Sequence, residues 1–329
     1  MTAKTTAALR VDPEWAAVLD QIGSGPQPNF TSVWDVREAV NTQLGPIVAA
    51  LPRHDGMLQT KHQVTSLDGT VIDVYRFLPK ALQANDTTTP AAADLGRAVV
   101  MNFGGGYVAG SAPSWAPAMA DLAERAGTQV FAPEYRIAPE HPAPAGVEDA
   151  FSTVAWLQLP QSAAAFGVDP ARIVVGGMSA GGGIAAGAAL LARDRGLSPP
   201  IAASLLRYPM LDDRTRLDDA DPLHPYLLWT QRQNELAWPA YLAGSDSVRY
   251  GAPGRTEDVA GLPDTYVGVG SLDLFKAENV DYAARLAKAD NNVELQLYSG
   301  IAHGFDLAVP GIRLSREMNA NEVRFIRRF

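Results

Sequence analysis

Short apolar segments that alternate with helical patterns constrain the fold of this 329-residue chain more than any other feature. Helical patterns lie between most of these segments, as at residues 147–157 and 279–289. Continuous apolar strands that alternate with helices are typical of a parallel sheet with both faces covered. The sequence therefore predicts an α/β fold, with a mostly parallel central sheet flanked by helices. The six segments expected to form its strands are residues 98–101, 129–132, 173–175, 203–206, 265–269 and 293–297.

Two stretches of the chain lie outside this alternation. Residues 1–55 are amphipathic, with helices that open near Pro13 and Ser32 and a break rich in glycine and proline at 23–26. Residues 211–242 form a long interruption that is rich in Asp, Pro, Trp and Tyr. An insertion of this length in a compact fold is typical of a lid or a substrate-binding element.

A β-hairpin is expected ahead of the first buried strand. Residues 64–67 and 71–77 have strand character, and they flank the tight turn Asp68-Gly69. The later residues 84–93 are polar and rich in Thr and Ala, which predicts an exposed loop.

Composition excludes several classes of protein. The net charge of −9 at pH 7 argues against nucleic-acid binding, which needs a basic face. The chain has no cysteine, which excludes disulfides, thiolate metal ligands and a cysteine nucleophile. It contains no His-Glu-x-x-His motif and no phosphate-binding Gly-Lys-Ser/Thr motif, so we expect neither a metal nor a cofactor.

Signals for a membrane are also missing from the sequence. The first residues contain no apolar run of the kind found in signal peptides, and no stretch approaches the roughly 20 apolar residues of a membrane helix. We therefore expect a cytoplasmic protein without a membrane span. A homodimer is left open as its assembly.

Ser179 stands among small residues directly after the predicted strand 173–175. A serine on a sharp turn between a strand and a helix needs neighbours without bulky side chains, and Gly177, Ala180 and Gly181 meet that need. The helix that follows would direct its unpaired N–H groups at the serine, where they favour a developing negative charge. Ser179 is thus a candidate nucleophile.

Two other interpretations of this turn are open. One is a glycine-rich turn that only packs a helix against a sheet. The other is a dinucleotide loop, since Gly181, Gly183 and Ala186 satisfy a loose form of that pattern. The dinucleotide pattern, however, places its first glycine inside the helix and lacks an acid at the end of a following second strand.

An acid and a histidine follow two of the later predicted strands. Asp273 comes after residues 265–269 and before a helix, and His303 comes after residues 293–297. A serine hydroxyl becomes nucleophilic when a histidine removes its proton, and a carboxylate holds that imidazole in the required tautomer. The sequence therefore predicts that His303 is the base for Ser179 and that Asp273 orients the base.

Other roles for the acids in this region are open. Asp273 also fits the N-cap position of the helix that follows, and the two roles are compatible. Asp264 is an alternative to Asp273 as the orienting acid. Glu278 is assigned to the helix surface or to a supporting position behind the site.

A glycine-rich loop, Gly104-Gly105-Gly106, directly follows the first buried strand, and its N–H groups can approach a carbonyl oxygen closely. Four segments of the chain form a recognisable set: Phe103-Gly-Gly-Gly-Tyr107, Tyr135-Arg-Ile-Ala-Pro-Glu-His-Pro142, Gly177-Met-Ser-Ala-Gly181 and His303-Gly-Phe305. With these segments, the chain resembles the hormone-sensitive-lipase group of α/β-hydrolases, the bacterial family IV esterases, over roughly residues 60–329.

This resemblance implies an α/β-hydrolase fold with a helical cap. Residues 1–55 would then be N-terminal cap helices, and residues 56–329 the catalytic domain with a cap insertion at about 211–242. It also implies a catalytic triad and an oxyanion hole. The triad would be Ser179, Asp273 and His303, and the donors of the oxyanion hole would be the N–H groups of Gly105, Gly106 and Ala180.

The activity implied by the resemblance is that of a serine carboxylic-ester hydrolase, which works through an acyl-enzyme. Its substrates would be small-molecule esters with short to medium acyl chains. An amidase or a lactonase would use the same triad, and a non-catalytic small-molecule receptor of the same fold is a further alternative. The side chains expected to line an apolar substrate pocket are Phe30, Trp34, Tyr107, Met178, Leu227, Leu228 and Trp229.

The chain differs from the group that it resembles at two positions of the expected site. Phe103 stands where the group has a histidine, and Met178 stands where it usually has an aspartate. The histidine braces the glycine loop, whereas the donors to substrate are backbone groups that survive here. We therefore expect a working oxyanion hole with altered packing behind the loop.

Overall fold

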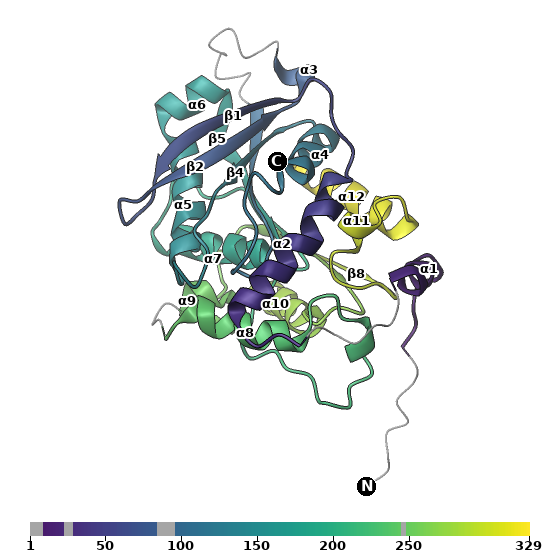
Figure 1. The fold of residues 1–329 in the computed structure, drawn as a ribbon. Helices are drawn as coiled ribbons and strands as arrows, with labels where there is room; N and C mark the ends of the chain where they lie inside the picture. Colours follow the sequence, from purple (N-terminus) through teal and green to yellow (C-terminus); the bar gives the residue numbers. More distant parts are fainter. Residues whose placement is uncertain (1–8, 23–28, 84–95, 245–247) are drawn as a thin grey trace.

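The computed structural model describes residues 9–22, 29–83, 96–244 and 248–329, and these form a central eight-stranded sheet with helices around it (Figure 1). The strand order is β1-β2-β4-β3-β5-β6-β7-β8. The pairs β1–β2 and β2–β4 are antiparallel, and every other neighbouring pair is parallel. The predicted mostly parallel sheet is confirmed. The break expected at 23–26 and the loop expected at 84–93 lie outside the described residues.

The central strands are apolar because the sheet is covered on both faces. Strands β4 and β6 are buried along their whole length. The bounds of the strands are β1 Leu58–Thr65, β2 Val71–Leu78, β3 Gly96–Asn102, β4 Gln129–Pro133, β5 Val168–Met178, β6 Ala203–Arg207, β7 Asp264–Gly270 and β8 Val293–Tyr298.

Helices cover the sheet in pairs. Helices α5 and α7 pack against each other and against β5, whereas α4 contacts α12 and β4. The α-helices are α1 Pro13–Ile22, α2 Val33–Ala49, α3 Lys80–Gln83, α4 Ala116–Ala126, α5 Ala145–Gln158, α6 Pro160–Phe166, α7 Ala180–Asp194, α8 Gln231–Leu242, α9 Val248–Gly251, α10 Lys276–Lys288, α11 Phe305–Ala308 and α12 Arg313–Ile326. Two 3₁₀ helices are η2 His224–Tyr226 and η3 Pro253–Arg255. Within the described residues, no helix combines the length and the apolarity that crossing a bilayer requires.

The predicted hairpin is formed by β1 and β2, with Thr65 opposite Val71. Its turn contains Gly69 at φ +88°, where the N–H of Gly69 donates to the carbonyl of Ser66 at 2.9 Å. Strand β1 begins at Leu58, well before the expected start at residue 64. It is an edge strand with one face in solvent, so most of its residues are polar and give no apolar run.

The two N-terminal helices lie in different places (Figure 1). Helix α2 begins after Ser32 with a capping box, in which the Ser32 hydroxyl accepts from the Asp35 N–H at 3.3 Å, and it packs on α8 of the interruption 211–242. Helix α1 lies instead near the end of β8, where the Arg313 N–H donates to Glu14 at 3.0 Å. The division into cap helices and a catalytic domain stays a prediction, and α2 is the N-terminal helix that contacts the insertion.

Candidate active site

Ser179 occupies a strained turn between β5 and α7, which we call the serine turn (residues 177–181). Its backbone has φ +56° and ψ −121°, a conformation that costs on the order of 1–3 kcal/mol for a residue with a side chain. A Cβ atom on Gly177 would lie 2.0 Å from the carbonyl oxygen of Gly181, and one on Gly181 would lie 2.2 Å from that of Asn102. The glycines on both sides of Ser179 are therefore a steric requirement of the turn.

The structure brings Ser179, His303 and Asp273 together in one chain of hydrogen bonds. Nε2 of His303 lies 2.9 Å from Oγ of Ser179, and Nδ1 lies 2.7 Å from Oδ2 of Asp273. The other carboxylate oxygen, Oδ1, accepts from the N–H of Phe275 at 2.9 Å. Asp273 is only 1% exposed, so its carboxylate is fixed by these contacts and shielded from water.

Aromatic side chains hold the imidazole of His303 from two sides. The rings of Tyr208 and Phe275 both meet it edge to face, with ring centroids 4.7 Å and 5.3 Å from that of His303. The alternative acid, Asp264, lies at the opposite end of β7 from Asp273, where it accepts from the side chain of Asn292 at 2.9 Å. The geometry thus selects Asp273 over Asp264 as the partner of His303.

The glycine-rich segment after β3 forms a tight turn beside the serine turn; we call residues 103–110 the oxyanion loop, after the oxyanion hole that the sequence predicts there. The carbonyl of Gly105 accepts from the N–H groups of Val108 and Ala109 at 3.1 Å and 3.0 Å. Gly105 has φ +142°, and a Cβ atom there would lie 2.1 Å from the carbonyl oxygen of Ala109. The loop packs directly on the first turn of α7. A Cβ atom on Gly181 would lie only 2.3 Å from the carbonyl oxygen of Phe103, so this close approach needs a glycine.

A family model described as alpha/beta hydrolase fold matches residues 99–307, which span the oxyanion loop and all three residues of the hydrogen-bonded chain. The chain belongs to this family. It is 33% identical over 326 residues to the carboxylesterase NlhH of Mycobacterium tuberculosis, with 94% of each chain covered. Together, the family model and this similarity show that the chain is an α/β-hydrolase of the hormone-sensitive-lipase group.

Solved structures of other family members have the same fold along nearly the whole chain. A bacterial heroin esterase superposes with a TM-score of 0.82 at 32% identity, covering 97% of this chain and 98% of its own. The esterase LipW from Mycobacterium marinum superposes with a TM-score of 0.77 at 31% identity, covering 96% and 95%.

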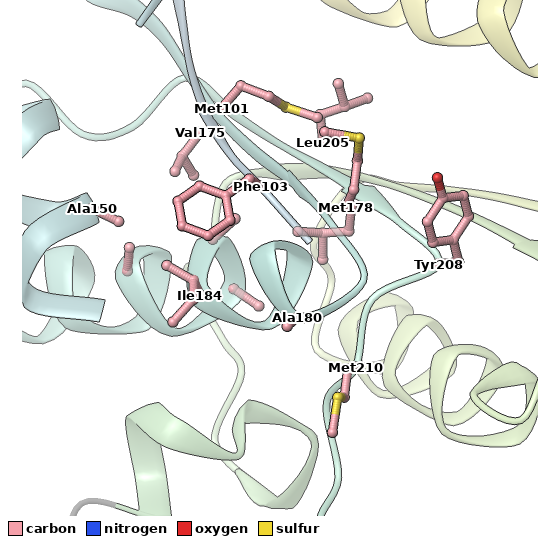
Figure 2. Close-up of a cluster of buried hydrophobic side chains, with 14 of the residues drawn as sticks. Met101, Phe103, Ala150, Val175, Met178, Ala180, Ile184, Leu205, Tyr208 and Met210 are labelled. Carbon is pink, nitrogen blue, oxygen red and sulfur yellow. The ribbon is translucent and has the colours of Figure 1, made fainter. Parts of the chain in front are cut away.

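Phe103 of this α/β-hydrolase is fully buried behind the oxyanion loop. Its ring stacks on that of Tyr135 with centroids 4.0 Å apart and planes at 16°, and the Tyr135 hydroxyl donates to the carbonyl of Phe103 at 2.8 Å. Figure 2 shows the ring between Val175 of β5 and Ile184 of α7. Packing and one hydrogen bond to the backbone thus hold this end of the loop.

We expect the substitution Phe103→His to be neutral or harmful to stability. An imidazole among these apolar side chains has no evident partner, and burying it unpaired costs about 1–3 kcal/mol of the free energy of unfolding. The melting temperature and the turnover of one small ester, measured for both proteins, test this. A variant that gained about tenfold in turnover at unchanged stability would show that Phe103 impairs the natural loop.

Among the side chains expected in the pocket, Trp229 lies against the oxyanion loop. A Cβ atom on Gly106 would lie 2.1 Å from Cη2 of Trp229, so the indole sits directly on this glycine. The indole is buried and donates from Nε1 to Oδ1 of Asn234 at 3.2 Å. Tyr107 is fully buried, stacks on Tyr241 with centroids 3.9 Å apart, and has its hydroxyl committed to a backbone carbonyl.

The other expected pocket residues are scattered. Met178 is buried on the sheet side, with its sulfur 3.7 Å from a guanidinium nitrogen of Arg207, and Figure 2 shows it directed toward Leu205 rather than toward α7. The indole of Trp34 is 52% exposed and Leu228 is 40% exposed, whereas Phe30 and Leu227 are buried. The role of these side chains as pocket walls stays a prediction.

An ionic network that no sequence motif predicts lies under the loop of His303. Arg207 at the end of β6 is buried and donates to Asp306 at 2.9 Å and to Glu322 at 2.7 Å. Asp306 comes three residues after His303, so the network ties the loop of His303 to β6 and α12. A buried pair of this kind is costly to break from one side, because the remaining charge loses its partner.

Glu278 is also buried, at 8% exposed, and does not lie on the surface of α10. Its Oε1 accepts from the N–H of Leu211 at 2.6 Å, and the hydroxyl of Thr215 donates to Oε2. This carboxyl therefore fastens the start of the insertion to the helix that follows Asp273. Burial raises the pKa of Glu278 well above its ordinary value.

We expect Glu278→Gln to flatten the dependence of stability on pH. An acid with a raised pKa in the folded state holds its proton longer than in the unfolded chain, so stability falls as pH rises above about 4.5. Glutamine keeps an acceptor for Leu211 and does not titrate. Melting temperatures at about pH 5 and pH 8 should therefore differ less for the variant than for the wild type. Equal differences would show that Glu278 does not cause this dependence.

Proposed function

We propose that Ser179 is the nucleophile of this enzyme, with His303 as its general base and Asp273 as the group that orients the base. The protein is a serine ester hydrolase of the carboxylesterase type, since its family and its relatives are of that kind. The observation that carries the assignment is the hydrogen-bonded chain from Oγ of Ser179 through His303 to Asp273, on a turn that strains the serine backbone.

In the first half of the proposed reaction, Oγ of Ser179 attacks the ester carbonyl while Nε2 of His303 takes the hydroxyl proton. The carbonyl oxygen becomes negatively charged, and the N–H groups of Gly105, Gly106 and Ala180 stabilise it. As the bond to the alcohol breaks, His303 gives the proton to the leaving oxygen. The products of this half are a free alcohol and an acyl group on Ser179.

In the second half, a water molecule gives a proton to Nε2 of His303 and attacks the acyl carbonyl. The same backbone donors stabilise the second tetrahedral intermediate. Ser179 leaves with the proton returned by His303, and the carboxylic acid is released. Asp273 stays ionised and stabilises the imidazolium that forms in each half.

We propose small-molecule esters with short to medium acyl chains as substrates. Trp229 supports this size range, because its indole covers Gly106 of the oxyanion loop and leaves less room beside the reacting carbonyl. A homodimer and a location in the cytoplasm stay predictions.

Covalent labelling tests the proposal most directly. A fluorophosphonate should modify one residue, Ser179, and mass spectrometry of the digested protein identifies the site. A series of nitrophenyl esters from acetate to laurate then measures the acyl preference, with matched anilides and lactones beside it. A protein that takes up no label would be a receptor with an inactive triad, and faster cleavage of anilides or lactones would favour an amidase or a lactonase.

A further inference from the structure

Helix α2 reaches the oxyanion loop through one arginine. Nε of Arg37 donates to the carbonyl of Val108 at 2.5 Å, and Nη2 donates to the carbonyl of Ala138 at 2.6 Å. One turn further along the helix, Oδ1 of Asn41 accepts from the N–H of Gly110 at 3.0 Å. Residues four apart share one face of a helix, so this face of α2 is fastened to the loop at two points.

The carbonyl that Arg37 holds belongs to the turn that shapes Gly105. Val108 donates its N–H to the carbonyl of Gly105 at 3.1 Å and gives its own carbonyl to Arg37. Ala138 donates to the carbonyl of Tyr107 at 2.9 Å and also gives its carbonyl to Arg37. The guanidinium therefore joins the segment of Tyr107 and Val108 to that of Ala138, and these two segments are also hydrogen-bonded to each other. Tyr107 and Val108 directly follow the glycines of the loop.

Arg37 is itself held in place on its outer side. Its Nη1 and Nη2 form a bidentate pair with Glu140, both distances being 2.6 Å. The guanidinium lies 4.7 Å from the ring centroid of Trp34, so this half-exposed indole covers one face of the arginine. The planar fork of a guanidinium loses less side-chain freedom per hydrogen bond than a flexible ammonium.

We propose that Arg37 is a positioning residue for the oxyanion hole. It fixes the carbonyl of Val108, and the N–H of Val108 in turn holds the carbonyl of the peptide that joins Gly105 to Gly106. This inference rests on the proposed function, in which the N–H groups of Gly105 and Gly106 stabilise the charged intermediate. Such donors lower a barrier only when they already point at the place where the charge develops. Phe103 anchors the start of the loop by packing, and Arg37 anchors its far side.

The test compares Arg37→Met with the wild type on a small ester and on a boronic acid, whose boron bonds to Oγ of Ser179 and mimics the tetrahedral intermediate. All rates are normalised by titration of reactive serines, which removes any effect of unfolded protein. We expect kcat to fall about 10- to 100-fold with KM nearly unchanged, as for a displacement of about 1 Å in a catalytic group. The affinity for the boronic acid should fall by the same factor.

Three further variants sharpen the test. Glu140→Gln keeps both backbone contacts of Arg37 and should retain kcat within about threefold. Arg37→Lys, which keeps the charge but not the fork, should lose at least about fivefold in kcat, and it serves if Arg37→Met does not fold. Arg313→Met, an exposed arginine on α12, is the matched control and should leave kcat unchanged.

Two results would overturn the inference. One is a normal kcat on titrated Arg37→Met or Arg37→Lys enzyme with a lower melting temperature, which would make Arg37 purely structural. The other is an equal loss in Glu140→Gln, which would assign the effect to the ion pair. Ser179→Ala is run in parallel: if it is inactive while the Arg37 variants are normal, this inference fails alone, and if it is active, the proposed function fails.

Discussion

Ser179→Ala is expected to lower the turnover of esters by about 10⁴- to 10⁶-fold, the usual cost of removing a triad nucleophile. Without Oγ, no acyl-enzyme forms, and only binding and the backbone donors remain to assist attack by water. The fold should persist, because among the described residues the side chain of Ser179 has a single hydrogen-bond partner, the imidazole of His303. The free energy of unfolding should change by no more than about 1 kcal/mol. Steady-state kinetics and thermal melting measure the two effects.

Ser204→Ala is the matched control for this substitution. Ser204 is also a buried serine, it lies on the neighbouring strand β6, and its hydroxyl has no hydrogen-bond partner among the described residues. Its removal should leave turnover unchanged. More than a tenth of the wild-type activity in Ser179→Ala, at the same protein concentration, would mean that another group performs the attack.

The three residues of the hydrogen-bonded chain could be predicted from the sequence because each follows a parallel strand. Ser179 follows β5, Asp273 follows β7 and His303 follows β8. The carboxyl ends of parallel strands meet at one edge of a sheet, so groups at these positions converge wherever the strands are recognised. Apolar runs make the strands recognisable, and small residues mark the serine turn.

The contacts that support the site could not be predicted in this way. Arg37 lies 71 residues from Val108 in sequence, and Arg207 lies 115 residues from Glu322. A single arginine or glutamate belongs to no periodic pattern of apolar residues, and its neighbours in sequence do not indicate which distant group it contacts. Glu278 shows the same limit, because a charged residue on a helix is exposed more often than buried.

The direction in which a side chain points is also hard to predict from the sequence, as the residues expected in the pocket show. The aromatic composition of residues 211–242 predicted a contribution to the site, and Trp229 does lie on Gly106. Trp34 and Met178, which lie outside this segment, are expected in the same pocket. Met178 is the last residue of β5, and its side chain lies on the sheet side near Arg207 although the next residue is Ser179.

Asp273→Asn should lower kcat by about 10⁴-fold through the tautomer of His303. The amide oxygen can still accept from the N–H of Phe275, so its NH₂ group takes the place of Oδ2, 2.7 Å from Nδ1 of His303. An NH₂ group donates, which forces Nδ1 to accept and moves the ring proton to Nε2. His303 then donates to Ser179 and cannot remove its proton. Steady-state kinetics should show this loss in kcat with KM largely kept.

Asp264→Asn is the control, since it makes the same change at the other end of β7. Asp264 pairs with Asn292 and Arg328 at the surface, at the far end of the strand from His303. The Asp264→Asn variant should therefore have wild-type turnover. A loss in Asp264→Asn comparable to that in Asp273→Asn would show that charge anywhere along β7 matters, and not the hydrogen bond to His303. If Asp273→Asn alone kept its kcat within about tenfold, His303 would not need an acceptor at Nδ1 and the assigned role of Asp273 would be wrong.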